Sequence, residues 1–414
     1  MPDSIPPSGR RDPGPAGAGT LADPAAPAGV ASPPPGGDGA RPASRAGRGG
    51  WARAAAGLAA AAAVCAVPFY AEAFWLQAGL FAMAAAIGAI GLNLLTGVAG
   101  QLSMGHAFFL AVGAYTYVWL AAEPERAAGH TLHGLGWPPP LAAAVAVAAA
   151  GIAGGLFSPI AGRLRGASLG IATLALVFLG QHVLFRAEAV TGGVNGRAVP
   201  PMEILGLRLA DSPEPPVVLG VPFGGLEMLW FPGAALLALA AWFARGVVYG
   251  RPGRALTTIR DHEIAAGAMG VPVARYRAGV FVVSSVYAGL AGVLLALVFQ
   301  RAVPEYFGLA LALDYLAMIV IGGLGSVGGA AAGAVFVSLL PQLLTRYGDA
   351  IPFVAQPGEE GLSPSEAARV LYGAAFVAVL LYLPRGLRGL LPRCAAPASR
   401  ARAVRAGDAG DPPR

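Results

Sequence analysis

The chain has 414 residues and a formal net charge of +6, yet only 12% of its residues are charged and 56% are hydrophobic. A soluble domain has about 25% charged residues, so the composition predicts an integral membrane protein, and arginines scattered between apolar runs exclude a nucleic-acid-binding stripe. All 28 basic residues are arginine. The absence of lysine excludes a P-loop ATPase and a Schiff-base enzyme, because both need a lysine. The two cysteines lie far apart in the sequence and are too few for a zinc site.

The two ends of the chain differ from its middle. Residues 1–50 contain 11 prolines and 11 glycines and no aromatic residue. Such a segment cannot bury enough apolar surface to offset the entropy lost on ordering, so we expect a disordered tail. The stretch 52–70 is interpreted as a first membrane helix and not as a secretory signal, because many apolar segments follow it. The arginine-rich stretch 386–414 is expected to be a second tail, which leaves 51–385 as the membrane domain.

Ten apolar runs approach the length of about 20 helical residues that crosses a bilayer. They cover residues 52–70, 76–97, 104–122, 141–160, 168–186, 227–245, 277–299, 309–323, 326–344 and 367–383. The run 309–323 is short for a span, and the glycines of 322–329 predict a tight turn after it. The predicted fold class is therefore all-α, with about ten transmembrane helices.

The arginines predict how these helices are oriented. An even number of spans places both termini on one side, and 21 of the 28 arginines then fall on that side. Because cytoplasmic loops are enriched in basic residues, both termini are expected to be cytoplasmic, with residues 187–226 and 345–366 outside. Small residues at helix-packing spacing favour close packing inside the bundle over a subunit interface, at Gly166/Gly170, Ser285/Gly289 and Gly325/Gly329/Gly333.

One hydrophilic segment, 249–277, is too polar to span a membrane and too helix-prone for a plain loop. Asp261 or Thr258 could cap a short helix here. Its small apolar face would consist of Ala265, Ala266 and Met269, and it would end at Gly270 before Pro272. Such a helix favours docking into another protein over lying on anionic lipid, because Asp261 and Glu263 are acidic.

Several motifs in this order resemble one family. Glu263-Ile-Ala-Ala followed by Gly270 resembles the EAA-type coupling motif of ABC importer permeases, and 253–276 resembles the coupling loop of LivM-type branched-chain amino acid permeases. Three further stretches are similar to that family, namely 91–109, 191–196 and 321–326, the last together with 384–387. The resemblance covers roughly residues 60–390.

The resemblance implies a type II ABC importer-like permease that moves branched-chain or other aliphatic amino acids across the plasma membrane. It implies contact with the ATPases through Gly253, Arg254, Arg260, Glu263, Ala265, Ala266, Gly270 and Pro272. Glycines that interrupt helices, together with nearby polar residues, predict a translocation pathway at Asn93, Gly97, Gly100, Gln101, Ser103, Gly105 and His106. The resemblance adds Thr191, Gly192, Gly193, Asn195 and Gly196 to this pathway. The implied partners are two cytoplasmic ABC ATPase subunits, a second homologous permease, a soluble substrate-binding protein and membrane lipid, with ATP bound by the ATPases and no cofactor on this chain.

Other functions remain open at this point. Related permeases import urea or short amides, and an ion-coupled secondary transporter would give Asp314 or His106 a coupling role. A hydrolase would rest only on Ser168 in the G-x-S-x-G pattern, which here opens a membrane helix without an accompanying acid and histidine. His106 and His182 lie too far apart in the sequence to predict a metal site.

Overall fold

The structure is a computed structural model that describes residues 59, 62–127, 130–164, 166–204, 206–210, 217–218, 221–347 and 364–382. All of them belong to the unit Leu58–Arg414. The predicted tails 1–50 and 386–414, and most of the first half of the predicted helix 52–70, lie outside the described residues.

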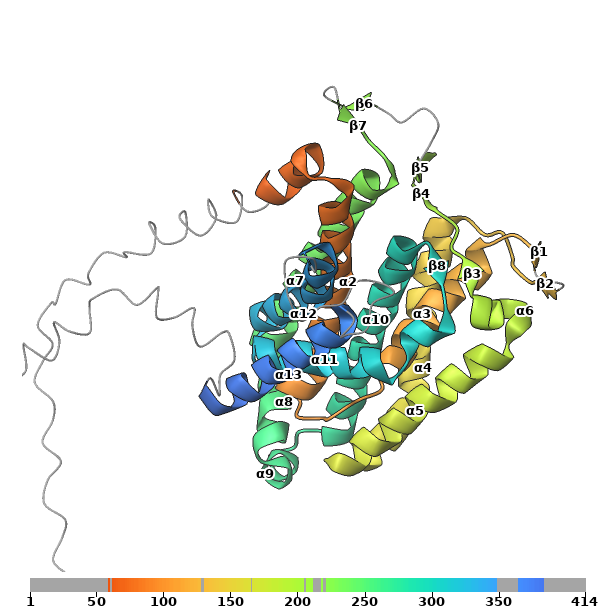
Figure 1. Cartoon of the computed structure of the whole chain (residues 1–414). Coiled ribbons are helices and arrows are strands. Elements are labelled where there is room, and N and C mark those ends of the chain that lie inside the picture. Colours follow the sequence, from red (N-terminus) through yellow and green to blue (C-terminus); the bar gives the residue numbers. More distant parts are fainter. Residues whose placement is uncertain are drawn as a thin grey trace, which may run out of the picture. The chain divides into compact units, whose positions relative to one another are not determined.

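Helices form most of the described chain (Figure 1). Helical residues 62–70 precede α2 (Ala73–Asn93), η1 (Leu94–Val98), α3 (His106–Ala121), α4 (Pro139–Arg163), α5 (Ala167–Arg186), α6 (Glu188–Thr191), η2 (Gly193–Asn195), α7 (Gly225–Tyr249), α8 (Arg251–Asp261), α9 (Glu263–Ala268), α10 (Val273–Phe299), η3 (Pro304–Phe307), α11 (Leu309–Gly322), α12 (Val327–Tyr347) and α13 (Pro364–Tyr382). The prediction of an all-α architecture is confirmed.

Six helical stretches of the described chain are long and apolar enough to cross a membrane. They are Ala73–Val98, α4, α5, α7, α10 and α12, while α3 and α11 are shorter apolar helices. At 1.5 Å per residue α11 is about 21 Å long, which agrees with the short span predicted at 309–323. The count of ten transmembrane helices stays a prediction.

Short strands join loops in antiparallel pairs. Among the described residues these pairs are β1 (Glu125–Ala127) with β2 (His130–Leu132), β3 (Arg197–Ala198) with β8 (Arg301–Ala302), β4 (Met202–Ile204) with β5 (Leu207–Leu209), and β6 (Val217–Val218) with β7 (Val221–Pro222). Only the β3–β8 pair joins segments distant in the sequence, because Arg197 lies opposite Ala302 and Ala198 opposite Arg301.

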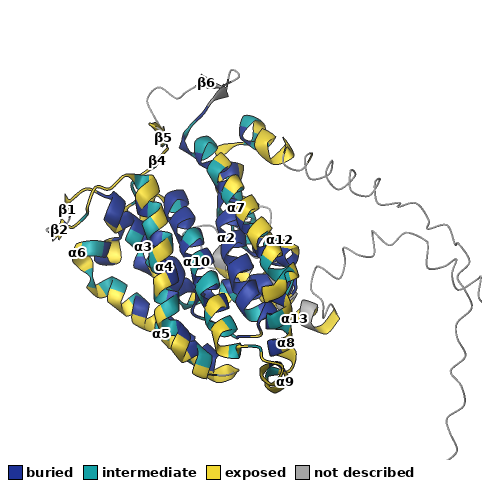
Figure 2. Cartoon of the chain, turned by 180° about the vertical axis from the view of Figure 1, so that it is seen from behind, coloured by how far each residue is buried: buried dark blue, intermediate teal, exposed yellow. Residues whose placement is uncertain are grey.

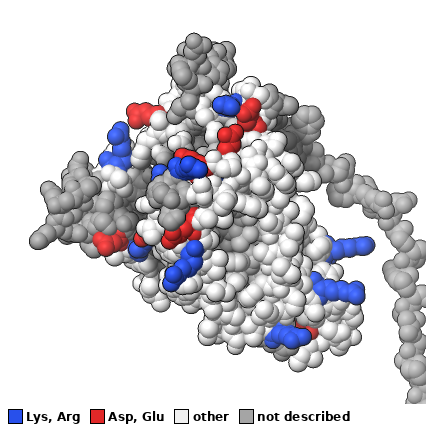
Figure 3. Space-filling model, turned by 90° about the vertical axis from the view of Figure 1, so that its right-hand side faces the viewer, with Lys and Arg blue, Asp and Glu red and all other residues white. Residues whose placement is uncertain are grey.

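The core of the bundle is formed by α2 and α10. In their most apolar windows 94% of the α2 residues and 78% of the α10 residues are buried, against 17% for α7 and 28% for α5 (Figure 2). Large apolar side chains on the outer helices are exposed, as at Leu156 and Trp242. Figure 3 shows the corresponding surface, where a broad uncharged area separates two zones of charged side chains. An uncharged surface, on a chain whose outer helices expose large apolar side chains, suits contact with lipid.

Glycines allow the inner helices to approach closely. A Cβ atom on Gly289 of α10 would lie 2.5 Å from the Ala150 side chain of α4, and one on Gly333 of α12 would collide with the backbone of α11. The predicted packing inside the bundle is thus confirmed for the Ser285/Gly289 and Gly325/Gly329/Gly333 rows. Gly166 differs, since a Cβ there would meet open space.

The loops gather at two ends of the bundle. We call residues 94–105, 250–272 and 323–326 the α8 face, because Arg260 and Gly325 both hydrogen-bond to residues of the α2 end. The β8 face comprises the described residues of 122–127, 130–137, 187–204 and 300–308. The β3–β8 pairing joins the last two segments, and Arg197 joins the first two to them through the Glu123 and His133 carbonyls. Figure 1 shows α8 and α9 at the lower end of the bundle, with the β3–β8 pair toward the upper end. This separation agrees with the alternation of the predicted spans.

Candidate functional site

The glycine-rich segment after α2 interrupts two helices, as its sequence predicts. The end of α2 continues as one π-helical turn, η1, and residues 99–105 are not helical before α3 begins at His106. Gly100 has a φ of 70°, a left-handed conformation that favours glycine. The Thr96 hydroxyl donates to the Gln101 carbonyl at 3.0 Å. Single π turns often occur at functional sites, so this junction is a candidate site on geometry alone.

Buried polar atoms without a hydrogen-bond partner collect near this junction. Among the described residues they include Asn93 Nδ2, both side-chain amide atoms of Gln101 and His106 Nε2. An unpaired buried polar group costs about 1–3 kcal/mol of folding free energy. Groups kept at that cost are candidates for contact with a ligand.

His106 connects three helices. Its ring hydrogen-bonds to the backbone of Gly88 in α2 and lies edge-on to Tyr315 of α11, with ring centroids 5.1 Å apart. A Cβ on Gly88 would lie 2.6 Å from the Tyr315 ring, so glycine is required for this approach. Tyr115 of α3 similarly packs against Phe307 at 5.8 Å. Tyr115 therefore lies toward the β8 face, and we call Asn93, Gln101, His106 and Tyr315 the polar cluster.

The predicted pathway residues Ser103 and Gly105 rest on α5. The Met104 backbone amide donates to the Thr173 hydroxyl at 2.9 Å, and the Gly105 amide donates to the Ser103 hydroxyl at 3.3 Å. A Cβ on Gly105 would lie 3.0 Å from Thr173. Sequence reasoning missed Thr173, whose only signal is a hydroxyl within an apolar helix.

The segment 191–196 lies at the β8 face, at the opposite end of the bundle from Gly97. Its glycines build tight turns, since Gly192, Gly193 and Gly196 have φ values of 76°, 58° and 63°. The Thr191 hydroxyl donates to the Leu184 carbonyl at 2.7 Å, and the Asn195 carbonyl accepts from Arg301 at 2.9 Å. The structure therefore does not bring this predicted part of the pathway together with the polar cluster.

Arg197, which sequence reasoning counted only as a charge, organises the β8 face. Its side chain is 2% exposed and donates to the carbonyls of Glu123 at 3.0 Å, Val190 at 3.4 Å and His133. Burial lowers the pKa of the guanidinium, whereas the charge of Glu125 raises it. Because arginine normally titrates far above neutral pH, it stays charged and ties these loops together.

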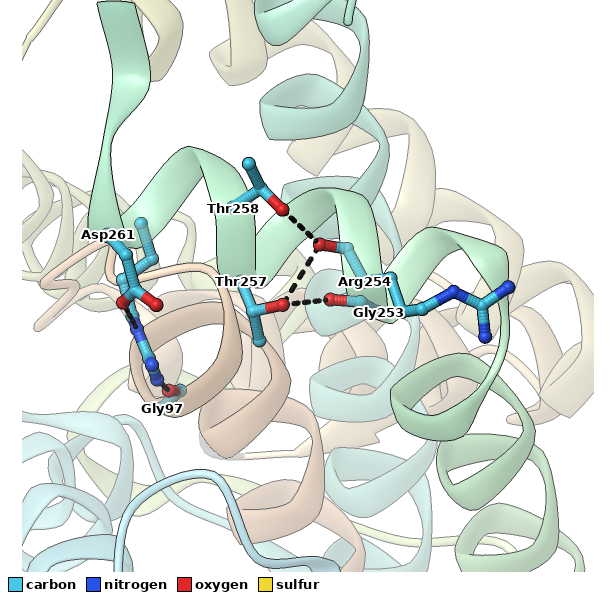
Figure 4. Close-up of polar contacts among 7 residues, drawn as sticks. Gly97, Gly253, Arg254, Thr257, Thr258 and Asp261 are labelled. Atoms are coloured by element: carbon cyan, nitrogen blue, oxygen red, sulfur yellow. Dashed lines mark hydrogen bonds and ion pairs between the residues drawn. The ribbon is translucent and has the colours of Figure 1, made fainter. Parts of the chain in front are cut away.

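The polar segment predicted as one short helix consists of two, α8 and α9. The prediction that Asp261 or Thr258 caps the helix is wrong, because the residue before α9 is His262 and makes no capping bond. Asp261 ends α8 and accepts from Arg260 at 2.9 Å, while the Thr258 hydroxyl donates back to the Arg254 carbonyl at 2.9 Å (Figure 4). A residue already in a helix cannot adopt the extended conformation of an N-cap.

The end of α9 agrees with its sequence. Gly270 has a φ of 83°, its amide donates to the Gly267 carbonyl at 3.0 Å, and the Val271 amide donates to the Ala266 carbonyl at 3.1 Å. These two bonds around a left-handed glycine form a Schellman motif. Pro272 then precedes α10. Gly253 makes the α7–α8 corner, where a Cβ would collide with the end of α7.

The exposed face of α9 differs from the predicted one. Ala266 is fully buried, so it cannot belong to a docking face. The apolar side chains that face outward are Ile264, 89% exposed, and Met269, 81% exposed, beside the exposed Ala265. Bulky apolar groups exposed at the end of a polar segment mark an interaction surface. We call Ile264, Ala265 and Met269 the α9 patch.

Glu263 is held within the chain. Its carboxylate accepts from both terminal nitrogens of Arg277 in α10, at 3.0 and 2.9 Å, and both side chains are largely shielded. Arg254 is different, because its side chain is exposed and its hydrogen bond to the Tyr249 carbonyl is long, at 3.5 Å. Asp314 lies half-buried in the second turn of α11. In the described part of the chain no three His, Cys, Asp or Glu residues cluster as metal ligands.

An apolar bundle with six helical stretches long enough to span, and large apolar side chains exposed on its outer helices, defines a multi-pass membrane protein among the described residues. The family model described as the permease component of the branched-chain amino acid transport system matches residues 74–380. The chain belongs to this family.

Individual relatives agree with this assignment. The chain is 28% identical over 310 residues to the high-affinity branched-chain amino acid transport system permease protein LivM of Salmonella typhimurium, covering 72% of this chain and 66% of the relative. The LivM protein of Escherichia coli gives the same identity over 309 residues. The permease protein LivH of Escherichia coli is 29% identical over 155 residues, covering 37% of this chain and 44% of LivH. The chain thus spans about two thirds of the length of the LivM proteins, and no solved structure matches significantly.

Proposed function

We propose that the chain is the permease subunit of an ATP-driven importer for branched-chain or other aliphatic amino acids. The observation that carries the proposal is the family match, which extends over 74–380 and therefore includes the polar cluster and the α9 patch. The LivM relatives are named as permeases for branched-chain amino acids, and the similarity brings that substrate class to this chain as part of the proposal.

The chemistry of the polar cluster supports a neutral, amphipathic solute. It offers amide, imidazole and phenol groups, and the aromatic ring of Tyr315 packs against the imidazole of His106. A zwitterionic aliphatic amino acid has no net charge, polar groups at one end and an apolar side chain at the other. Such a solute can pair with the unsatisfied amides while its side chain contacts aromatic surface.

The proposal requires partners. ATP would be bound by two cytoplasmic ABC ATPase subunits that contact the α9 patch, and a soluble binding protein would deliver the solute at the β8 face. A second homologous permease would complete the pathway, and the partial similarity to LivH supports the existence of such homologous pairs. The complex would lie in the bacterial plasma membrane, with the α8 face and both termini cytoplasmic.

Uptake measurements test this proposal. In vesicles containing this chain with the ATPases, second permease and binding protein, we expect radiolabelled leucine to accumulate only when ATP is present on the side of the ATPases. Unlabelled isoleucine and valine should compete, whereas urea and acetamide should not. ATP-independent accumulation driven by an ion gradient, or competition by urea alone, would contradict the proposal.

Labelling measures the proposed orientation. In a variant whose two native cysteines are serine, Val194→Cys at the β8 face should react with an impermeant thiol reagent in intact cells. Ile264→Cys in α9 should react only after the cells are opened. The chain is expressed without the ATPases, which would cover α9. Both native side chains are then well exposed, at 77% and 89%, so a lack of reaction reports sidedness and not burial. The reverse pattern would place the α8 face outside and refute the orientation.

A further inference from the structure

Arg260 joins α8 to the glycine-rich junction. Its guanidinium donates to the Gly97 carbonyl at 2.9 Å across 163 residues of sequence, and its Nε donates to Asp261 at 2.9 Å. Figure 4 shows this link between Asp261 at the end of α8 and Gly97. A Cβ on Gly100 would lie 2.5 Å from Arg260 Cγ, so the arginine stem occupies the space that a side chain on Gly100 would need. The absence of side chains at Gly97 and Gly100 thus leaves the space that the Arg260 side chain occupies.

Gly97 also lies next to a second glycine-containing loop, residues 323–326. The Gly325 amide, between α11 and α12, donates to Asn93 Oδ1 at 2.9 Å. A Cβ on Gly97 would collide with both Asn93 Oδ1 and the Gly325 nitrogen. Arg260, Gly97, Asn93 and Gly325 therefore form one continuous chain of contacts, which we call the Arg260 relay. It reaches from α8 through the end of α2 to the α11–α12 loop.

The Arg260 relay leads to two helices, α2 and α11, that carry residues of the polar cluster. Asn93 belongs to the cluster itself and lies five residues after Gly88, the contact of His106. Tyr315, which packs against His106, is part of α11, the helix that leads to Gly325. A displacement of α8 would thus move the α2 end and the α11–α12 loop together. Interactions that have two discrete arrangements can carry coupling between separate sites.

We propose that Arg260 is a positioning residue that transmits movement of the α8–α9 segment to the two glycine loops below the polar cluster, and so couples ATP hydrolysis on the partner subunits to opening of the cluster. This inference rests on the proposed function. Arg260 itself contacts neither solute nor ATP. Its loss should therefore separate transport from hydrolysis without removing either partner.

The test uses Arg260→Ala in vesicles containing the whole complex. We expect leucine uptake to fall about tenfold or more, while ATP hydrolysis, the amount of complex in the membrane and co-purification of the ATPases stay at wild-type levels. Arg260→Lys should recover part of the uptake, because an ammonium can reach the Gly97 carbonyl but cannot bind Asp261 through a planar fork at the same time. Arg251→Ala is the matched control, since it removes a charge from an exposed position on the same helix.

A second readout follows the α11–α12 loop directly. Leu324 is 52% exposed beside Gly325, so a cysteine there, in a chain without Cys65 and Cys394, can be labelled. With Arg260 present, trapping the ATPases with ATP and vanadate should change the labelling rate at position 324. With Arg260→Ala, the rate should no longer respond to the trapped nucleotide.

The outcomes distinguish the relay from the function on which it rests. If the unmodified complex shows no ATP-driven uptake, the proposed function fails. If it transports normally and Arg260→Ala behaves like Arg251→Ala, only the relay is overturned. The relay is equally overturned if uptake and hydrolysis fall in proportion with loss of the ATPases, because Arg260 would then be a docking residue, or if nucleotide still changes labelling at 324 in Arg260→Ala.

Discussion

Replacement of Gly97 by alanine is expected to reduce leucine uptake by about tenfold or more, although it adds a single methyl group. The new Cβ would occupy the position where the Gly325 amide meets Asn93 Oδ1, which are 2.9 Å apart. Backbone on one side and a fully buried side chain on the other leave little room for relaxation, so the hydrogen bond between the two loops must break. Overpacking of this kind costs about 1–3 kcal/mol.

Uptake should be measured with the quantity of protein in the membrane held equal. Because α2 keeps its length and its apolar character, Gly97→Ala is expected to insert normally. Gly246→Ala is the matched control, since Gly246 is also helical but a Cβ there has no neighbour within 4 Å. Wild-type uptake by Gly97→Ala would mean that the two loops move independently of each other.

The sequence predicted those features of the structure that are determined by residues close together in the chain. The apolar runs located helices such as α7 and α10 to within a few residues, because hydropathy and length alone decide which segments can cross a bilayer. Gly270 and Pro272 marked the end of α9 for a similar reason. A left-handed residue followed by proline limits the backbone whatever surrounds it.

The contacts that build the site could not be predicted in this way, because they join distant residues. Nothing in the sequence around Arg260 indicates that its partner is a carbonyl 163 residues away, and Thr173 meets Met104 across 69 residues. Which side of the six-residue helix α9 is buried depends on its neighbours, so Ala266 was assigned to the wrong face. The glycine pattern located the junction, but only the packing of α2, α3 and α11 places Tyr315 against His106 and Gly88.

Reversal of the charge on Glu263 is expected to impair transport, and exchange of the two partners should restore it. The Glu263 carboxylate accepts hydrogen bonds of 3.0 and 2.9 Å from Arg277. Glu263→Arg replaces this carboxylate with a second guanidinium group, which repels that of Arg277. Each hydrogen bond to a charged group contributes about 1.5–3 kcal/mol when it is shielded from water. Without the pair, α9 loses its attachment to α10, and the α9 patch loses its fixed position.

The double variant decides what Glu263 does. If the carboxylate acts through Arg277, Glu263→Arg and Arg277→Glu should each lose ATP-driven uptake and retain the ATPases poorly, whereas the combined exchange should recover a large part of both. If Glu263 instead meets a basic group on an ATPase, the exchange will stay as impaired as Glu263→Arg. Glu203→Arg provides the control, because its ion pair with Arg208 at 3.3 Å is exposed to solvent and such pairs contribute about 0–1 kcal/mol. Recovery by the exchanged pair would show that the position of the α9 patch depends on the attachment of Glu263 to Arg277 in α10, and not on a contact between the carboxylate and a partner.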